Sequence, residues 1–278
     1  MYVKWPRSYS KPVTPPVVLA VGGSDSSGAS GIQADLKTFA ALKVYGAAVV
    51  TAVTSRNTRT VADVFGLPAT VVAAQLGAVL DDLPIVAVKT GMFPSAESAA
   101  AVAARARSGA LPNLVVDPVL LTASGSRMGV TAAMERLLPY ALVATPDREE
   151  ASALLGWQVA TPNDMATAVA QIASGGPKYV VITGGDFATG TEALDVVWID
   201  GAAKALHAPR IASRNTFGSG ATFAAAIAAR IALGDEPAAA ILAAKGYVSR
   251  AIGDAVDWDM GTGTGPLDHF GWSSLSLA

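Results

Sequence analysis

The chain has 278 residues, a length that suits one large core or two modest domains. Hydrophobic residues make up 51% and charged residues 15%, which predicts elements buried on more than one face. The net charge of -2 and the absence of a basic block argue against nucleic acid as a partner. The chain has no cysteine, which excludes disulfides, thiolate metal sites and a cysteine nucleophile. Its two histidines argue against a zinc site or a Ser-His-Asp triad.

Residues 1–16 are rich in proline and lack the apolar core of a signal peptide, so we expect a flexible N-terminal extension. No run of about 18 apolar residues occurs, because arginines interrupt the alanine-rich stretches. We therefore expect a cytoplasmic protein that contacts no membrane. Residues 17–278 contain neither a repeat nor a linker-like segment, which favours one domain.

Short apolar runs alternate with helical windows from residue 17 to residue 183. The expected strands cover residues 17–21, 47–54, 87–90, 114–117, 142–145 and 179–183. The expected helices cover residues 32–42, 71–80, 97–107, 131–138, 148–155 and 165–173. This alternation predicts an α/β fold with a central, mostly parallel sheet and helices on both of its faces.

Several helices are preceded by residues that cap helix starts. Thr70 and Ser95 are the expected N-caps of the second and third helices, and Thr161-Pro162-Asn163-Asp164 resembles a capping box.

The pattern changes in the last third of the chain. Strand-like runs over 194–199 and 203–208 flank Asp200-Gly201, which predicts an antiparallel hairpin at the sheet edge. Two alanine-rich helices are then expected over 219–233 and 236–252.

The first candidate site follows the first strand. An apolar run enters a glycine- and serine-rich loop that contains Asp25 and then opens a helix that contains Asp35. A buried strand that feeds such a loop and a helix start is where α/β proteins place small ligands. Glycines in the loop let a ligand approach the backbone closely.

The second candidate site is the segment 215–222, which opens a later helix. Gly218 and Gly220 leave backbone N–H groups free to converge on an anion, such as a phosphoryl group in transfer. A tight turn that lets the helix pack on the sheet explains the glycines as well, and alone it is the simpler interpretation. We expect this bend and the first loop to face each other across one crevice.

Acidic residues stand at the ends of two later strands. Asp117 ends a buried strand, where parallel sheets bind ligands, although it is equally suited to cap the next segment. Asp147 and Glu150 share one face of a helix start and have the chemistry to orient a hydrated Mg²⁺. First-turn acids also favour the helix dipole, and alone that simpler role is preferred.

Three further segments give weaker signals. The strand that ends at Thr183 and Gly185 shapes a nucleotide pocket or merely turns the chain, and Met92 is a candidate pocket wall or plain core. The glycine-rich segment 261–265 is a weak signal for a site, and a flexible terminal loop explains it equally well. No Walker A motif occurs.

Together these segments resemble the ribokinase-like superfamily, and more narrowly its hydroxymethylpyrimidine/phosphomethylpyrimidine kinases of thiamine biosynthesis. The matching motifs, in the family's order, are G-S-D-S-S-G-A-S-G-I-Q-A-D-L-K-T from Gly23, K-T-G-M from Lys89, V-V-D-P-V from Val115, T-P-D-x-x-E-A from Thr145, G-S-G-A-T from Gly218 and G-P-L-D-H from Gly265.

The resemblance implies an ATP- and Mg²⁺-dependent kinase that phosphorylates hydroxymethylpyrimidine and then its monophosphate. It also implies a homodimer. It implies a catalytic anion hole at Gly218, Ser219 and Gly220. It implies that Gly23, Asp35 and Met92 surround the pyrimidine, that Asp117 and Glu150 help organise magnesium and phosphates, and that the loop 215–220 forms the anion hole. To these we add Asp25 and Arg56 as candidate acceptor-binding residues and Asp147 as a candidate metal-organising residue. The candidate ATP- or phosphate-binding residues are Asn215, Thr216, Thr183 and Gly185.

The chain departs from the family pattern in four places. Ala221 stands where relatives place the base for the substrate hydroxyl, and a methyl group accepts no proton. Arg56 replaces a glutamine that contacts the pyrimidine, and its guanidinium suits a phosphorylated or carboxylated substrate. Residues 123–126 replace Lys-Ser-Gly-Asp, and Thr262 and Thr264 replace paired histidines.

Two alternatives therefore stay open. The first alternative is a kinase with another small-molecule substrate, because pyridoxal kinases of the same subgroup share the first motif. The second is a protein that binds a pyrimidine or nucleotide without turnover, because Ala221 removes the expected base.

Overall fold

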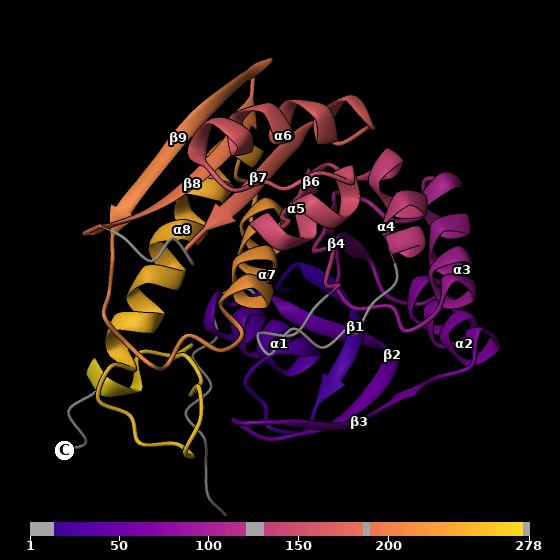
Figure 1. Cartoon of the computed structure of the whole chain (residues 1–278). Helices are drawn as coiled ribbons and strands as arrows, with labels where there is room; N and C mark the ends of the chain where they lie inside the picture. The colour runs from indigo at the N-terminus through magenta and orange to yellow at the C-terminus, as the bar shows by residue number, and fades with distance from the viewer. Residues whose placement is uncertain (1–13, 121–130, 186–189, 275–278) are drawn as a thin grey trace, which may run out of the picture.

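The computed structural model describes residues 14–120, 131–185 and 190–274 (Figure 1). Most of the expected N-terminal extension, the segment 123–126 and Asp186 lie outside these ranges. Within them, no helix has both the length and the apolar character needed to cross a bilayer.

The structure describes a nine-stranded sheet of order β3-β2-β1-β4-β5-β6-β7-β8-β9. Strands β2, β1, β4, β5, β6 and β7 run parallel, whereas β3, β8 and β9 pair antiparallel with their neighbours. The strands are β1 Val17–Asp25, β2 Tyr45–Arg56, β3 Val61–Gly66, β4 Ile85–Thr90, β5 Leu114–Val116, β6 Val143–Ala144, β7 Tyr179–Gly184, β8 Glu192–Ile199 and β9 Ala202–Pro209.

This topology confirms the α/β prediction and the hairpin around Asp200-Gly201, which joins β8 to β9. It also contains a second antiparallel edge that the sequence did not suggest. Strand β2 extends to Arg56 and turns back as β3, and Val53 lies directly opposite Phe65 in this hairpin. Both of these side chains are exposed.

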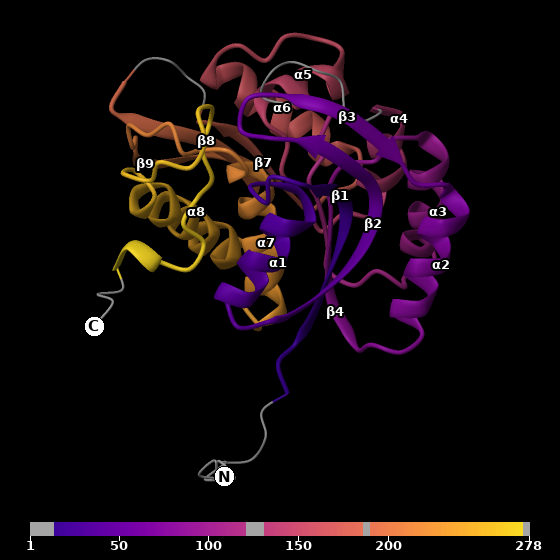
Figure 2. The ribbon, with the colours of Figure 1, turned by 90° about the horizontal axis from the view of Figure 1, so that it is seen from below.

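Helices cover both faces of the sheet (Figure 2). They are α1 Gly31–Ala41, α2 Ala69–Leu80, α3 Ala96–Arg107, α4 Thr131–Leu137, α5 Arg148–Leu155, α6 Pro162–Ser174, α7 Ser219–Ala232 and α8 Pro237–Asp254, with short 3₁₀ turns η1 Leu138–Tyr140 and η2 Trp272–Ser274. Helices α1, α7 and α8 share one apolar core, whereas α2, α3 and α4 share a second and α5 and α6 a third.

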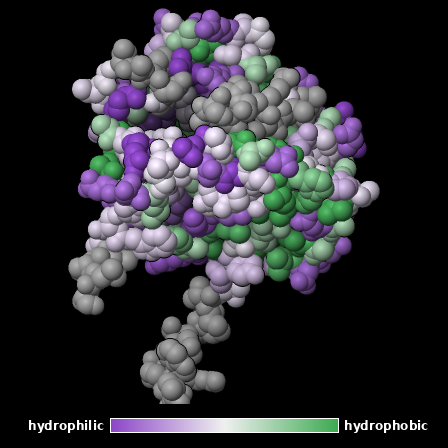
Figure 3. All heavy atoms as spheres, turned by 60° about the horizontal axis from the view of Figure 1, so that its bottom comes forward, coloured by the Kyte–Doolittle hydropathy of each residue, from purple (hydrophilic) through white to green (hydrophobic). Residues whose placement is uncertain are grey.

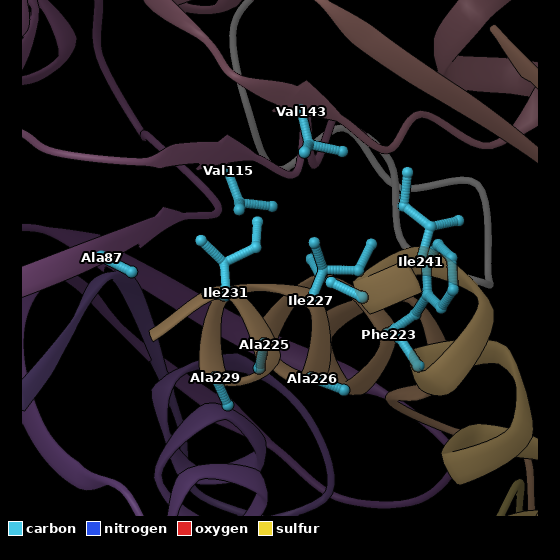
Figure 4. Packing of buried hydrophobic residues seen from close by; sticks show 14 of the residues in the cluster. Ala87, Val115, Val143, Phe223, Ala225, Ala226, Ile227, Ala229, Ile231 and Ile241 are labelled. Carbon is cyan, nitrogen blue, oxygen red and sulfur yellow. The ribbon is translucent and has the colours of Figure 1, made fainter. Parts of the chain in front are cut away.

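Successive side chains of β1 point to opposite faces of the sheet, which explains why the first two cores are separate. Val18 and Ala20 are buried against α1 and α7, whereas Leu19 and Val21 point to the opposite face. Figure 4 shows Ile227 and Ile231 of α7 turned toward Val115 and Val143 of the sheet.

The alanines explain how α7 fits between the sheet and its helical neighbours. Six consecutive residues, 224–229, are fully buried, and five of them are alanine. Small side chains on all faces let α1, α8 and the sheet pack close around one helix. The outer surface mixes hydrophobic and polar patches, and Figure 3 shows hydrophobic residues gathered on one side of the face viewed there.

Two of the three predicted helix caps are confirmed. The Ser95 side chain accepts a hydrogen bond from the Ser98 N–H, and Thr161 forms a capping box with Asp164. The Thr70 prediction is wrong, because α2 already begins at Ala69 and its N-cap is Pro68. The Pro68 carbonyl accepts hydrogen bonds from the N–H groups of Val71 and Val72, so the helical bonding starts one residue pair earlier than a cap at Thr70 requires.

Candidate active site

A pocket lies at the carboxyl ends of β1, β2 and β4, where parallel sheets hold ligands. Its empty volume is about 600 Å³, including space open to solvent. It is lined by Gly22, Gly23, Ser24, Asp25, Ser30, Gly31, Asp35, Thr54, Arg56, Lys89, Gly91, Met92, Val119, Phe217 and Ala221. The first loop and the later bend thus contribute to the same cavity, as expected.

The two glycine segments touch directly. Gly218 has φ +89°, and a Cβ at this position would stand 1.9 Å from the Ala29 carbonyl oxygen. It is also the N-cap of α7, so the first N–H groups of that helix begin beside the first loop. The predicted anion-hole residues Gly218, Ser219 and Gly220 do not themselves line the pocket, but in the sequence they stand between two residues that do, Phe217 and Ala221. Only glycine fits this conformation and this contact.

Asp25 holds the first loop in shape. Its Oδ1 accepts hydrogen bonds from the Ser27 N–H and hydroxyl, each at 2.8 Å. Its Oδ2 accepts a third from the Ser30 N–H, also at 2.8 Å. The carboxylate therefore accepts its hydrogen bonds from its own loop, and Asp25 forms part of the pocket wall.

Lys89 is a site residue that sequence reasoning missed. Its Nζ lies 3.0 Å from Asp35 Oδ1 and 3.1 Å from Asp117 Oδ2, and all three side chains are buried. Asp117 therefore pairs with a lysine, which neither proposed role anticipated. A lysine inside the apolar run of β4 was the available signal, because such a residue is rarely buried without a charged partner.

This charge cluster shifts the pKa values of its members. Burial raises the pKa of Asp35 to about 6, although the Lys89 ammonium acts in the opposite direction. Burial lowers the pKa of Lys89, but Asp35 and Asp117 together outweigh it, and the net effect is upward. One cation is shared by two carboxylates, so the cluster ties the pocket wall at Asp35 to the end of β5.

Arg56 enters the pocket from the end of β2. Its guanidinium carbon lies 3.9 Å from the centroid of the Phe217 ring, in a cation–π contact. Its Nε lies 3.9 Å from Asp25 Oδ1, which is beyond hydrogen-bond range. The pocket therefore contains a largely buried cation with spare donors.

Asp147 and Glu150 bind each other at the start of α5. Glu150 N–H donates to Asp147 Oδ1 at 2.7 Å, and Asp147 N–H donates to Glu150 Oε2 at 2.9 Å, which is a capping box. Burial, with the negative charges of Asp147 and Asp117, raises the pKa of Glu150 well above its usual value. In the part of the chain described, no three acidic or histidine side chains form a direct metal cage.

Four predicted nucleotide-binding residues do not line this pocket. They are Asn215, Thr216, Thr183 and Gly185. Asn215 is fully buried, and its side-chain amide donates to the carbonyls of Ala255 at 2.6 Å and Trp258 at 3.0 Å. It therefore anchors the C-terminal segment. Thr183 is bridged to Asp147 and lies beside the capping box.

Gly261 and Gly263 pack against the β2–β3 turn, whereas Gly265 packs against the Asn215 side chain. Thr58 accepts a hydrogen bond from the Gly263 N–H at 3.1 Å, and its carbonyl accepts another from Thr264 at 3.1 Å. A Cβ at Gly263 would stand 2.0 Å from the Thr58 carbonyl oxygen. These glycines thus have a packing role, and this loop links the hairpin to the bend at Phe217, whose N–H donates to the Gly265 carbonyl.

Comparison with known proteins identifies the family of this chain. The family model for phosphomethylpyrimidine kinase matches residues 25–268. A hydroxymethylpyrimidine/phosphomethylpyrimidine kinase of Streptomyces coelicolor is 43% identical over 266 residues, which cover 94% of this chain and 97% of that protein.

Solved structures show the same fold. An ADP complex of Bacillus subtilis pyridoxal kinase superposes with a TM-score of 0.85 at 35% identity, covering 93% of this chain and 98% of that one. A phosphomethylpyrimidine kinase from Clostridium difficile gives a TM-score of 0.74 at 34% identity, covering 85% and 99%. The family expected from the motifs is thereby confirmed: this chain belongs to the phosphomethylpyrimidine kinase family.

Proposed function

We propose that the protein transfers the γ-phosphoryl group of ATP to hydroxymethylpyrimidine and then to its monophosphate, in thiamine biosynthesis. The observation that carries this proposal is the contact between Gly218 and the Ala29 carbonyl. It puts the backbone N–H groups at the start of α7 beside the pocket that the first loop forms. An acceptor hydroxyl and a phosphoryl group would thus meet at one place.

The acceptor would lie between the first loop and β4. Met92 packs directly on Gly23, because a Cβ on the glycine would stand 2.5 Å from Met92 Cε. A flat heteroaromatic ring would lie on the pocket surface that these two residues form, since glycine and a thioether present no bulky polar group to it. Asp35 lines this wall beside them, with its Oδ1 held 3.0 Å from the Lys89 ammonium.

The phosphate would lie against the amides of Gly218, Ser219 and Gly220, where the positive end of the α7 dipole favours negative charge. Asp117, Asp147 and Glu150 fit Mg²⁺ by their chemistry, since all three are oxygen donors, and burial together with the charges of Asp147 and Asp117 raises the pKa of Glu150. When bound, Mg²⁺ would neutralise phosphate charge.

Ala221 lines the pocket where the family pattern places a base. Positioned acid–base catalysis contributes about 10²–10⁴-fold, whereas phosphoryl transfer depends mainly on positioning and charge stabilisation. We therefore propose slow turnover. A pKa of about 6 makes Asp35 a suitable proton acceptor near neutral pH.

The test uses the purified chain with ATP, Mg²⁺ and hydroxymethylpyrimidine, and ³¹P NMR to detect the mono- and diphosphate. Pyridoxal is assayed in parallel, because the TM-score of 0.85 to a pyridoxal kinase favours it as the second candidate substrate. Product from pyridoxal alone would replace the proposed substrate. No product from either, with thermal stabilisation by ligand, would instead support a binding protein without turnover.

A further inference from the structure

Arg56 is held in the pocket by its backbone as well as its side chain. Its N–H donates to Ser26 Oγ at 2.9 Å, and that hydroxyl donates to the Arg56 carbonyl at 2.8 Å. Ser26 of the first loop thus binds both the N–H and the carbonyl of Arg56. These two hydrogen bonds fix the Arg56 backbone, so less conformational entropy is lost when its guanidinium binds a ligand.

The side chain is buried but poorly neutralised. It is 12% exposed, lies over the Phe217 ring, and its buried Nε has no hydrogen-bond partner in the part of the chain described. The nearest carboxylate, Asp25, is 3.9 Å away, and its Oδ1 already accepts two hydrogen bonds from Ser27. Burial lowers the pKa of Arg56 and Asp25 raises it, yet a guanidinium stays protonated.

We propose that Arg56 makes this pocket selective for an acceptor that already carries a phosphomonoester over the neutral alcohol. This inference rests on the proposed function and names the acceptor that the site prefers. A phosphomonoester is a near-dianion at neutral pH and offers paired oxygens that match the guanidinium fork. The neutral hydroxymethyl compound offers a single hydroxyl and adds no counter-charge to the buried cation, whose nearest carboxylate is Asp25 at 3.9 Å.

The ring of Phe217 gives the guanidinium a defined plane. Arginine stacked on an aromatic face keeps its N–H edge free for in-plane hydrogen bonds, which a lysine ammonium does not reproduce. Phe217 directly precedes Gly218, so the cation belongs to the same bend as the candidate anion hole. The pocket wall is thereby positive on the side where the acceptor's phosphate would approach.

The experiment measures dissociation constants by calorimetry without nucleotide, for phosphomethylpyrimidine and hydroxymethylpyrimidine. The variants are Arg56→Gln, Arg56→Lys and the matched control Arg59→Gln, which removes an exposed arginine from the same hairpin. We expect Arg56→Gln to weaken phosphomethylpyrimidine binding about 10- to 100-fold, with the alcohol changed less than about threefold. Arg56→Lys should recover only part of the loss, and Arg59→Gln should bind like the parent.

Equal changes for both compounds, or no change for either, would overturn the inference. Tighter parental binding of the alcohol would overturn it as well. Thermal melts confirm that each variant is folded, and Arg56→Lys keeps the test decisive if Arg56→Gln is unstable.

The same measurements distinguish a refutation of the proposed function from a refutation of this inference. A parent that binds phosphomethylpyrimidine through Arg56 but forms no diphosphate would refute the kinase and leave the selectivity standing. A parent that forms both phosphates with an unchanged preference in Arg56→Gln would do the reverse.

Discussion

Substituting Gly218 by alanine should disrupt the contact on which the proposed site depends. The added Cβ would stand 1.9 Å from the Ala29 oxygen, and a tolerable contact begins near 3.0 Å, so one segment must move by about 1.1 Å. A misplacement of about 1 Å at reacting groups costs on the order of 10²-fold in rate. The left-handed backbone adds about 1–2 kcal/mol of strain.

Gly234, just beyond the other end of α7, provides the matched control. It also has a positive φ, +99°, but a Cβ there would meet nothing within 4 Å. Gly234→Ala should therefore lose about 1–2 kcal/mol of unfolding free energy and keep its phosphate transfer. Gly218→Ala should lose at least as much stability and about 100-fold in kcat/KM.

Urea denaturation and a steady-state kinase assay measure the two effects on the same samples. If Gly218→Ala is folded and transfers phosphate as fast as Gly234→Ala, the bend is not the anion site and the geometric reasoning is refuted.

Three other perturbations test separate parts of the site. Ala221→Asp should raise kcat by about 10²–10⁴-fold in the kinase assay, and an unchanged kcat would mean that a missing base does not limit turnover. Lys89→Met should cost about 3–5 kcal/mol of unfolding free energy at pH 7, because it strands two buried carboxylates; a loss below about 1 kcal/mol would contradict the shared ion pair. Burial lowers the pKa of His269 to about 4, below its ordinary 6.5, so the unfolded chain binds more protons between these values. Protonation of His269 should therefore lower the free energy of unfolding by up to about 3 kcal/mol as the pH falls from 6.5 to 4. His269→Gln should make the free energy of unfolding depend less on pH in this range, as measured by denaturation at several pH values. An unchanged pH dependence would argue against a neutral buried imidazole.

The periodicity of the sequence predicted most of the sheet but missed β3. Its residues, Val61–Gly66, are mostly exposed, and their pattern mixes apolar and polar side chains on an edge strand. Strand propensity predicts little for a strand whose side chains are mostly exposed. The pairing of Val53 with Phe65 depends instead on the turn at residues 57–60, which hydrogen bonds of Asn57 stabilise.

Local motifs in the site were predictable, but contacts between distant segments were not. The acids of α5 are three residues apart, so their capping role could be inferred from spacing. Lys89 and Asp35 are 54 residues apart, and only the fold brings them together. Asn215 looked like a phosphate ligand by its place before the glycines, yet its amide faces the carbonyls near Ala255.

A crystal structure with hydroxymethylpyrimidine and a non-hydrolysable ATP analogue tests the central claim most directly. We predict that the pyrimidine ring lies in the pocket lined by Gly23, Asp35 and Met92. Its hydroxyl should face the amides of Gly218 and Gly220, with the terminal phosphate of the nucleotide within hydrogen-bond range of the same amides. Density for the pyrimidine outside this pocket, or for the nucleotide phosphate away from the start of α7, would contradict the proposed site.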